Sequence, residues 1–73
     1  MNIEITTEYI KLDQLLKFSG VVSSGTDAKY FITEGMVKLN GVVELQRGKK
    51  IRRGDVVLIG GGTFGNDVDI NVC

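Results

Sequence analysis

The chain has 73 residues, of which 42% are hydrophobic, so it is long enough for one small globular domain and too apolar for a disordered tail. Ten glycines and no proline indicate short elements joined by tight turns. The formal net charge is zero, and a single cysteine at the last position excludes an internal disulfide.

The charges are distributed unevenly along the chain. All nine basic residues fall between Lys11 and Arg53, a segment that holds only four acids and therefore has a net charge of +5. The remaining residues carry five acids and no base, which gives them a net charge of −5. This split permits a polyanion-binding face on a neutral protein, although ordinary scatter of surface charge would give the same count.

The N-terminal half predicts a short strand followed by two helices. Ile3 and Ile5 alternate with polar residues, as in a half-buried strand. The first helix is predicted from Lys11 to Ser19, because its leucines recur at helical spacing, and Gly20 closes it.

The second helix is predicted from Gly25 to Glu34. Ser24 is a good N-cap, and Asp27 three residues later suits a capping box. Gly35 ends the helix. Its buried face is predicted to comprise Ala28, Phe31 and Ile32.

The C-terminal half predicts a sheet. Asn40-Gly41, after a short alternating stretch, is the strongest short signal for a type I′ hairpin. Further strands are predicted at residues 56–59 and 68–72, and a turn at residues 53–55. The chain is therefore predicted to be one α+β domain over residues 1–73, with two packed helices against a small, mostly antiparallel, bent sheet.

Four short motifs together resemble an RNA-binding family. They are Lys11-Leu12-Asp13-x-x-Leu16, Ser23-Ser24 followed by Ala28-Lys29, Gly35-x-Val37-x-Leu39-Asn40-Gly41, and Gly54-Asp55-x-Val57. In this combination, over about residues 9–59, the chain resembles the S4 domain, or alpha-L motif, which also occurs in a ribosomal protein, pseudouridine synthases and tyrosyl-tRNA synthetases. Its added N- and C-terminal strands make it look most like the small stand-alone bacterial S4-like proteins of the YaaA/YbcJ type.

The resemblance implies the alpha-L fold and a non-catalytic role in binding structured RNA, with ribosomal RNA or an assembling ribosome as the expected partner. The positions that match the family's contact surface are Lys11, Lys17, Ser24, Lys29, Lys38 and Asn40. Gly25 and Tyr30 stand where the family often has basic residues. This departure favours the alternative, a protein-interaction adaptor that retains the S4 fold with weak or no RNA binding. Tyr30 is a candidate for stacking on a base, but partial packing against the core is the favoured interpretation.

A second set of candidate phosphate contacts is the densest basic cluster, which forms either an auxiliary phosphate patch or a solvated loop. Its members are Arg47, Lys49, Lys50, Arg52 and Arg53. The start of the second helix would also offer unpaired N–H groups to a phosphate, although Asp27 already compensates part of that dipole. Each candidate has a structural alternative: Ser24 as a cap, Asn40 as a turn residue, and Lys17 as an ion-pair partner of Asp13.

Other functional classes find little support in the sequence. Gly60-x-Gly62-x-x-Gly65 matches the dinucleotide fingerprint, but the residues after it predict a strand and not the helix that this fingerprint opens. There is no histidine and Cys73 is terminal, so no enzyme, metal site or cofactor is expected. The chain shows neither a secretory signal pattern nor a membrane-length apolar run, and a cytoplasmic protein without a membrane partner is expected.

Overall fold

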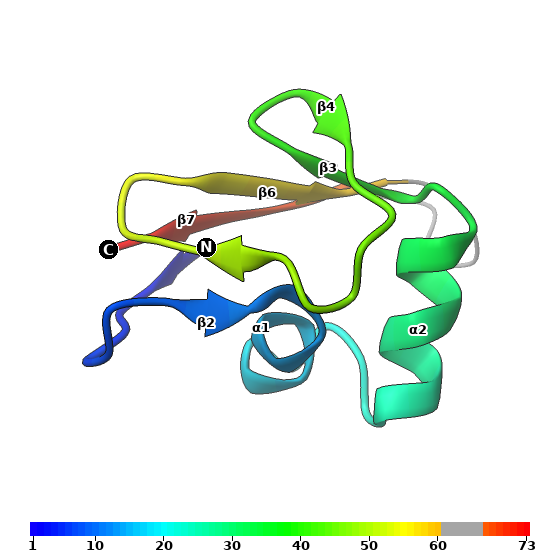
Figure 1. The fold of residues 1–73 in the computed structure, drawn as a ribbon, viewed down its shortest axis with the longest axis horizontal. Helices are drawn as coiled ribbons and strands as arrows, with labels where there is room; N and C mark the ends of the chain where they lie inside the picture. Colours follow the sequence, from blue (N-terminus) through cyan, green and yellow to red (C-terminus); the bar gives the residue numbers. More distant parts are fainter. Residues whose placement is uncertain (61–66) are drawn as a thin grey trace.

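A five-stranded sheet forms one layer of the domain in the computed structural model, which describes residues 1–60 and 67–73 (Figure 1). The strands lie in the order β1-β7-β6-β3-β4. Their bounds are Asn2–Ile3 for β1, Val68–Val72 for β7, Val56–Ile59 for β6, Val37–Leu39 for β3 and Val42–Val43 for β4. Neighbouring strands are antiparallel except β1 and β7, which pair in parallel. The predicted small, mostly antiparallel sheet with added terminal strands is confirmed.

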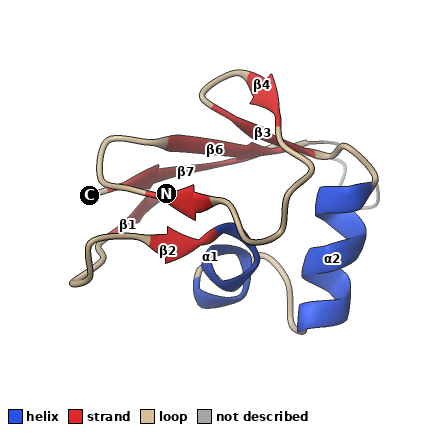
Figure 2. Ribbon diagram, viewed as in Figure 1, coloured by secondary structure: helices blue, strands red, loops and turns tan. Residues whose placement is uncertain are grey.

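Two helices cover one face of this sheet (Figure 2). Helix α1 is Leu12–Phe18 and helix α2 is Gly25–Thr33, close to the predicted bounds. Gly20 and Gly35 follow them with φ of +82° and +76°, the left-handed conformation that glycine adopts without steric cost. Within the described residues, neither helix has the length and apolarity needed to cross a membrane.

The hairpin between β3 and β4 has the predicted turn. Asn40 has φ of +51° and Gly41 has φ of +88°. Two consecutive positive φ values are the mark of the type I′ turn, whose twist matches that of the flanking strands. Leu39 therefore pairs directly with Val42 across the turn.

A second, two-stranded sheet was not predicted. Strand β2 is Ile10–Lys11 and strand β5 is Lys50–Ile51, and they pair antiparallel. Two-residue strands are too short to show an alternating pattern, and the partners lie far apart in the sequence. Helix α1 consequently begins at Leu12 and not at Lys11.

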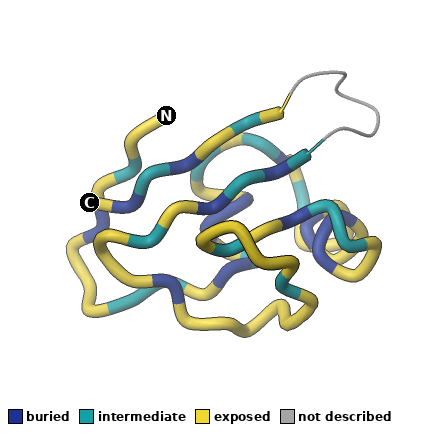
Figure 3. The backbone as a smooth tube through the Cα atoms, turned by 90° about the horizontal axis from the view of Figure 1, so that it is seen from above, coloured by how far each residue is buried: buried dark blue, intermediate teal, exposed yellow. Residues whose placement is uncertain are grey.

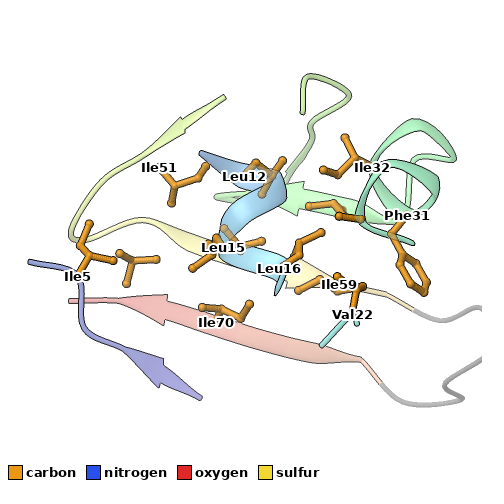
Figure 4. Close-up of a cluster of buried hydrophobic side chains, with 14 residues drawn as sticks. Ile5, Leu12, Leu15, Leu16, Val22, Phe31, Ile32, Ile51, Ile59 and Ile70 are labelled. Atoms are coloured by element: carbon orange, nitrogen blue, oxygen red, sulfur yellow. The ribbon is translucent and has the colours of Figure 1, made fainter. Parts of the chain in front are cut away.

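Buried hydrophobic side chains from both layers form one core (Figure 4), and Figure 3 colours the buried positions dark blue along the backbone. The helices contribute Leu12, Leu15, Leu16, Ala28, Phe31 and Ile32, and the two sheets contribute Val37, Ile51, Val57, Ile59, Ile70 and Val72. The predicted buried face of α2 is confirmed, as is the burial of the three leucines of α1. Phe18 is 65% exposed, so only the leucines anchor α1.

Candidate nucleic-acid interface

The first turn of α1 donates two hydrogen bonds to residues 46–53, a segment that includes β5 and that we call the basic loop. The N–H of Asp13 donates to the carbonyl of Arg47 at 3.1 Å, and the N–H of Leu12 donates to the carbonyl of Lys49 at 2.9 Å. First-turn N–H groups have no partner within their own helix, so the loop satisfies them. The backbone of the loop is thus fixed, while the side chains of Arg47 and Lys49 are exposed to solvent.

The carboxylate of Asp55 fixes the end of the basic loop. One oxygen accepts the N–H of Arg52 at 2.8 Å, and the other accepts the side-chain amide of Asn40 at 3.1 Å. The side-chain carbonyl of Asn40 in turn accepts the N–H of Val56 at 2.9 Å. Asn40 therefore connects the β3–β4 hairpin to β6 and has a structural role independent of any contact with RNA.

Two substitutions separate the side-chain role of Asn40 from its backbone role. Asn40→Gly keeps the left-handed backbone but removes both hydrogen bonds, and is expected to lower the free energy of unfolding by about 1–3 kcal/mol. Asn40→Ala also places a Cβ at a positive φ, which is expected to cost about 1 kcal/mol more. Urea denaturation measures both losses. An alanine variant as stable as the parent would show that the connection contributes nothing.

The basic loop, the β3–β4 hairpin and the turn before β6 surround one open hollow of about 680 Å³, which we call the basic hollow. Ligand sites in proteins are about 300–1,000 Å³, so the size is suitable. Its charged walls are Lys49, Lys50, Arg52, Arg53 and Asp55. Four cations against one carboxylate create a positive potential that favours a phosphate.

Arg53 also serves the fold. Its guanidinium donates to the carbonyl of Ile5 at 3.0 Å and so ties the basic loop to the segment after β1. A guanidinium carries five N–H donors, and the remaining ones stay available to a ligand in the basic hollow. A variant that lacks this side chain would lose a contact of the fold as well as a ligand contact, so its affinity for RNA would not report on binding alone.

Lys11 joins the basic loop through the small sheet. It lies directly opposite Lys50 in the β2–β5 register. The bond from the N–H of Leu12 to the carbonyl of Lys49 marks Lys11 and Lys50 as a non-hydrogen-bonded pair, where facing side chains come closest. Two like charges that face each other at such a pair are destabilising. An anion bound between the two ammonium groups would therefore relieve their repulsion.

The start of α2 is less suited to a phosphate than the basic hollow. Ser24 is the N-cap, as predicted, and its hydroxyl accepts the N–H of Asp27 at 3.2 Å. The Asp27 carboxylate accepts the hydroxyl of Ser23 at 3.1 Å, where a full capping box would have it accept a backbone N–H. The helix thus presents its own carboxylate at the end where an anion would bind.

The other predicted lysines lie away from the basic hollow. Lys38 is exposed between two inward-facing residues of β3 and lines a separate hollow of about 350 Å³ with Leu58 and Asp67. Lys17 occupies the last turn of α1, and Lys29 is exposed on α2. The predicted ion pair of Lys17 with Asp13 is not formed in the described part of the chain.

Two residues at the interface were missed. Tyr9 is half-buried, and its ring centroid lies 4.9 Å from the ammonium of Lys50, a cation–π contact. Asp55, expected only in a turn, organises the basic hollow. The signal for Asp55 was present as Arg53-Gly54-Asp55, but nothing local indicated Asn40 as its partner. Partial core packing was the favoured interpretation for Tyr30. Its side chain is 51% exposed, and its ring meets the ring of Phe31 edge-on with 5.7 Å between the centroids.

Residues 61–66 lie outside the described structure, and with them Gly62 and Gly65 of the dinucleotide fingerprint. Within residues 1–60 and 67–73, no three cysteine, aspartate or glutamate side chains group closely enough to hold a metal ion.

Comparison with known proteins gives three findings. The family model described as "S4 domain" matches residues 3–65. "Probable ribosome maturation protein RlbA" of Bacillus subtilis (strain 168) is 46% identical over 63 residues, which cover 85% of this chain and 89% of the relative. "Putative RNA-binding protein YbcJ" of Escherichia coli (strain K12) is 42% identical over 53 residues, or 73% of this chain and 76% of the relative.

The fold is also that of a solved structure. The solution structure of YbcJ from E. coli, described as revealing an alfaL motif involved in RNA-binding, superposes with a TM-score of 0.67 at 32% identity. The similarity covers 96% of this chain and 85% of that chain.

Proposed function

The chain belongs to the S4 domain family, and from this premise we propose that it is a single-domain module, over residues 1–73, that binds structured RNA and catalyses no reaction. The observation that carries the proposal is the basic hollow, which four cationic residues and one carboxylate line along a segment whose backbone is hydrogen-bonded to α1. The protein-interaction alternative predicts no coherent basic face, and the basic hollow therefore argues against it.

The recognition mode follows from the chemistry of the hollow. Lysine and arginine side chains bind phosphate oxygens, which position a protein on RNA without reading its sequence. An RNA helix also displays 2′-hydroxyls in a wide minor groove, and proteins recognise such a helix mainly by its shape. We therefore expect this site to recognise the spacing of phosphates in a folded RNA. We therefore assign the primary contacts to Lys11, Arg47, Lys49, Lys50, Arg52 and Arg53. The second group, Lys17, Ser24, Lys29, Lys38 and Asn40, we assign to secondary contacts.

The partner we propose is ribosomal RNA or an assembling ribosomal particle in the cytoplasm. The support is the relative from B. subtilis, which carries the name of a probable ribosome maturation protein and is 46% identical. The four cationic residues that line the basic hollow also support this partner, because ribosomal RNA is a folded polyanion with closely spaced phosphates.

Crosslinking the intact protein to RNA in its native cells, followed by sequencing of the recovered RNA, tests this function. We expect one region of ribosomal RNA to be enriched. The enrichment should be lost in a variant with Lys49, Lys50 and Arg52 changed to glutamine, and kept when Lys38 alone is changed. Recovery of no RNA above background, with a protein partner captured in its place, would contradict the proposal.

A further inference from the structure

We propose that a second hollow, beside Tyr9, receives one unpaired base of the bound RNA. The inference rests on the proposed function and adds to it the class of RNA: a structured RNA with an extruded or bulged nucleotide. The hollow measures about 520 Å³ and lies where the chain enters β2. It is lined by Thr7, Glu8, Tyr9, Ile10, Lys11 and Gln14.

The ring of Tyr9 is held in place before any ligand binds. It is half-buried, and the hydroxyl of Thr7 donates to the Tyr9 carbonyl at 2.8 Å, which fixes the backbone there. The ammonium of Lys50 lies 4.9 Å from the ring centroid. Lys50 lines the basic hollow and is not part of the lining of the second hollow, whereas Tyr9 lines the second hollow.

The polar groups of this hollow suit a base better than a phosphate. The carboxylate of Glu8 repels an anion but accepts hydrogen bonds from the amino groups of a base. The amide of Gln14 can both donate to and accept from a base edge. An aromatic ring beside such groups is the usual platform on which proteins stack unpaired bases.

The register of the small sheet joins the two hollows. Lys11 lines the hollow beside Tyr9, Lys50 lines the basic hollow, and the two residues face each other across β2 and β5. A phosphate held between these lysines would carry its neighbouring phosphates into the basic hollow and its base toward Tyr9. This juxtaposition of ring, carboxylate and paired lysines is what distinguishes the site from a plain phosphate patch.

Two RNA hairpins that differ by one nucleotide provide the test. One carries a single bulged adenosine in its stem, and the other has the same stem fully paired. The parent protein is expected to bind the bulged hairpin about 10-fold more tightly, since stacking of one base contributes about that much. Tyr9→Leu should abolish the preference, so that the variant binds both hairpins with equal affinity. Tyr9→Phe should keep the preference, as should Tyr30→Leu, which removes an exposed aromatic ring elsewhere.

Equal affinity of the parent for both hairpins, or a preference that survives Tyr9→Leu, would overturn the base site. If neither hairpin shows salt-dependent binding to the protein, the proposed function itself is overturned. This outcome is distinct from the loss of the base site alone. If Tyr9→Leu does not fold, 2-aminopurine at the bulge reports on the parent protein alone. Its fluorescence should be quenched on binding, and unchanged fluorescence at saturation would also overturn the base site.

Discussion

Replacing Phe31 by alanine is expected to lower the free energy of unfolding by about 3–5 kcal/mol. Phe31 is only 7% exposed and belongs to the single core between the helices and the sheet (Figure 4). A chain of 73 residues has a total stability of about 4–11 kcal/mol, so the loss is a large share of the whole. The melting temperature should fall by at least about 10 °C.

The neighbouring Tyr30 supplies a matched control. It is also aromatic and also in α2, but it is 51% exposed. Tyr30→Ala should therefore change stability by less than about 1 kcal/mol. A thermal melt of the two variants compares them directly. If Phe31→Ala melts like the parent, the assignment of the buried face of α2 is wrong.

The elements that the sequence predicted are those with strong local signals. Leucines at helical spacing place the buried face of α1, and Gly20 and Gly35 end the helices because they adopt positive φ at no steric cost. Asn40-Gly41 specifies its own turn type in the same way. Each of these signals lies within a few residues of the structure that it determines.

The features that were not predicted depend on residues distant in the sequence. Strands β2 and β5 have two residues each, and β1 pairs in parallel with β7 at the other end of the chain. The basic hollow requires Asn40, Asp55 and the basic loop to meet through hydrogen bonds that leave no periodic trace. Such contacts are determined by the whole fold, so a single sequence does not reveal them.

The same limit applies to the candidate interface. The basic cluster was visible as a run of charges, but its sequence did not show that its backbone is bound to α1. The N–H groups of Asp13 and Leu12 donate to the carbonyls of Arg47 and Lys49 and fix that backbone. Conversely, Lys38 matched a family position, yet the alternation of β3 places it on the outer face of the sheet, away from the basic hollow.

Changing Lys49, Lys50 and Arg52 together to glutamine is expected to weaken RNA binding by about 10- to 100-fold at moderate salt. All three side chains are exposed and line the basic hollow, whereas their backbone groups hold the fold. Glutamine keeps most of the side-chain length. The cation–π contact between Lys50 and Tyr9 is lost, which should cost no more than about 1 kcal/mol of stability. A thermal melt confirms that the variant is folded.

A second variant removes the same amount of charge from elsewhere. Lys17, Lys29 and Lys38 are exposed lysines on three different elements, and none of them lines the basic hollow. Changing them to glutamine also lowers the net charge by three, so it reproduces the general electrostatic effect. This control should weaken binding by several-fold at most, because its charges do not converge on one phosphate-binding space.

The most direct test of the account is the salt dependence of RNA binding by the parent and these two variants. The logarithm of the binding constant falls linearly with the logarithm of salt concentration, with a slope set by the number of phosphates neutralised. We expect the slope of the basic-loop variant to be shallower than that of the parent by about 2–3, and the slope of the control to change by about 1 or less. Equal slopes for the parent and the basic-loop variant, or a larger change in the control, would place the RNA elsewhere and contradict the account.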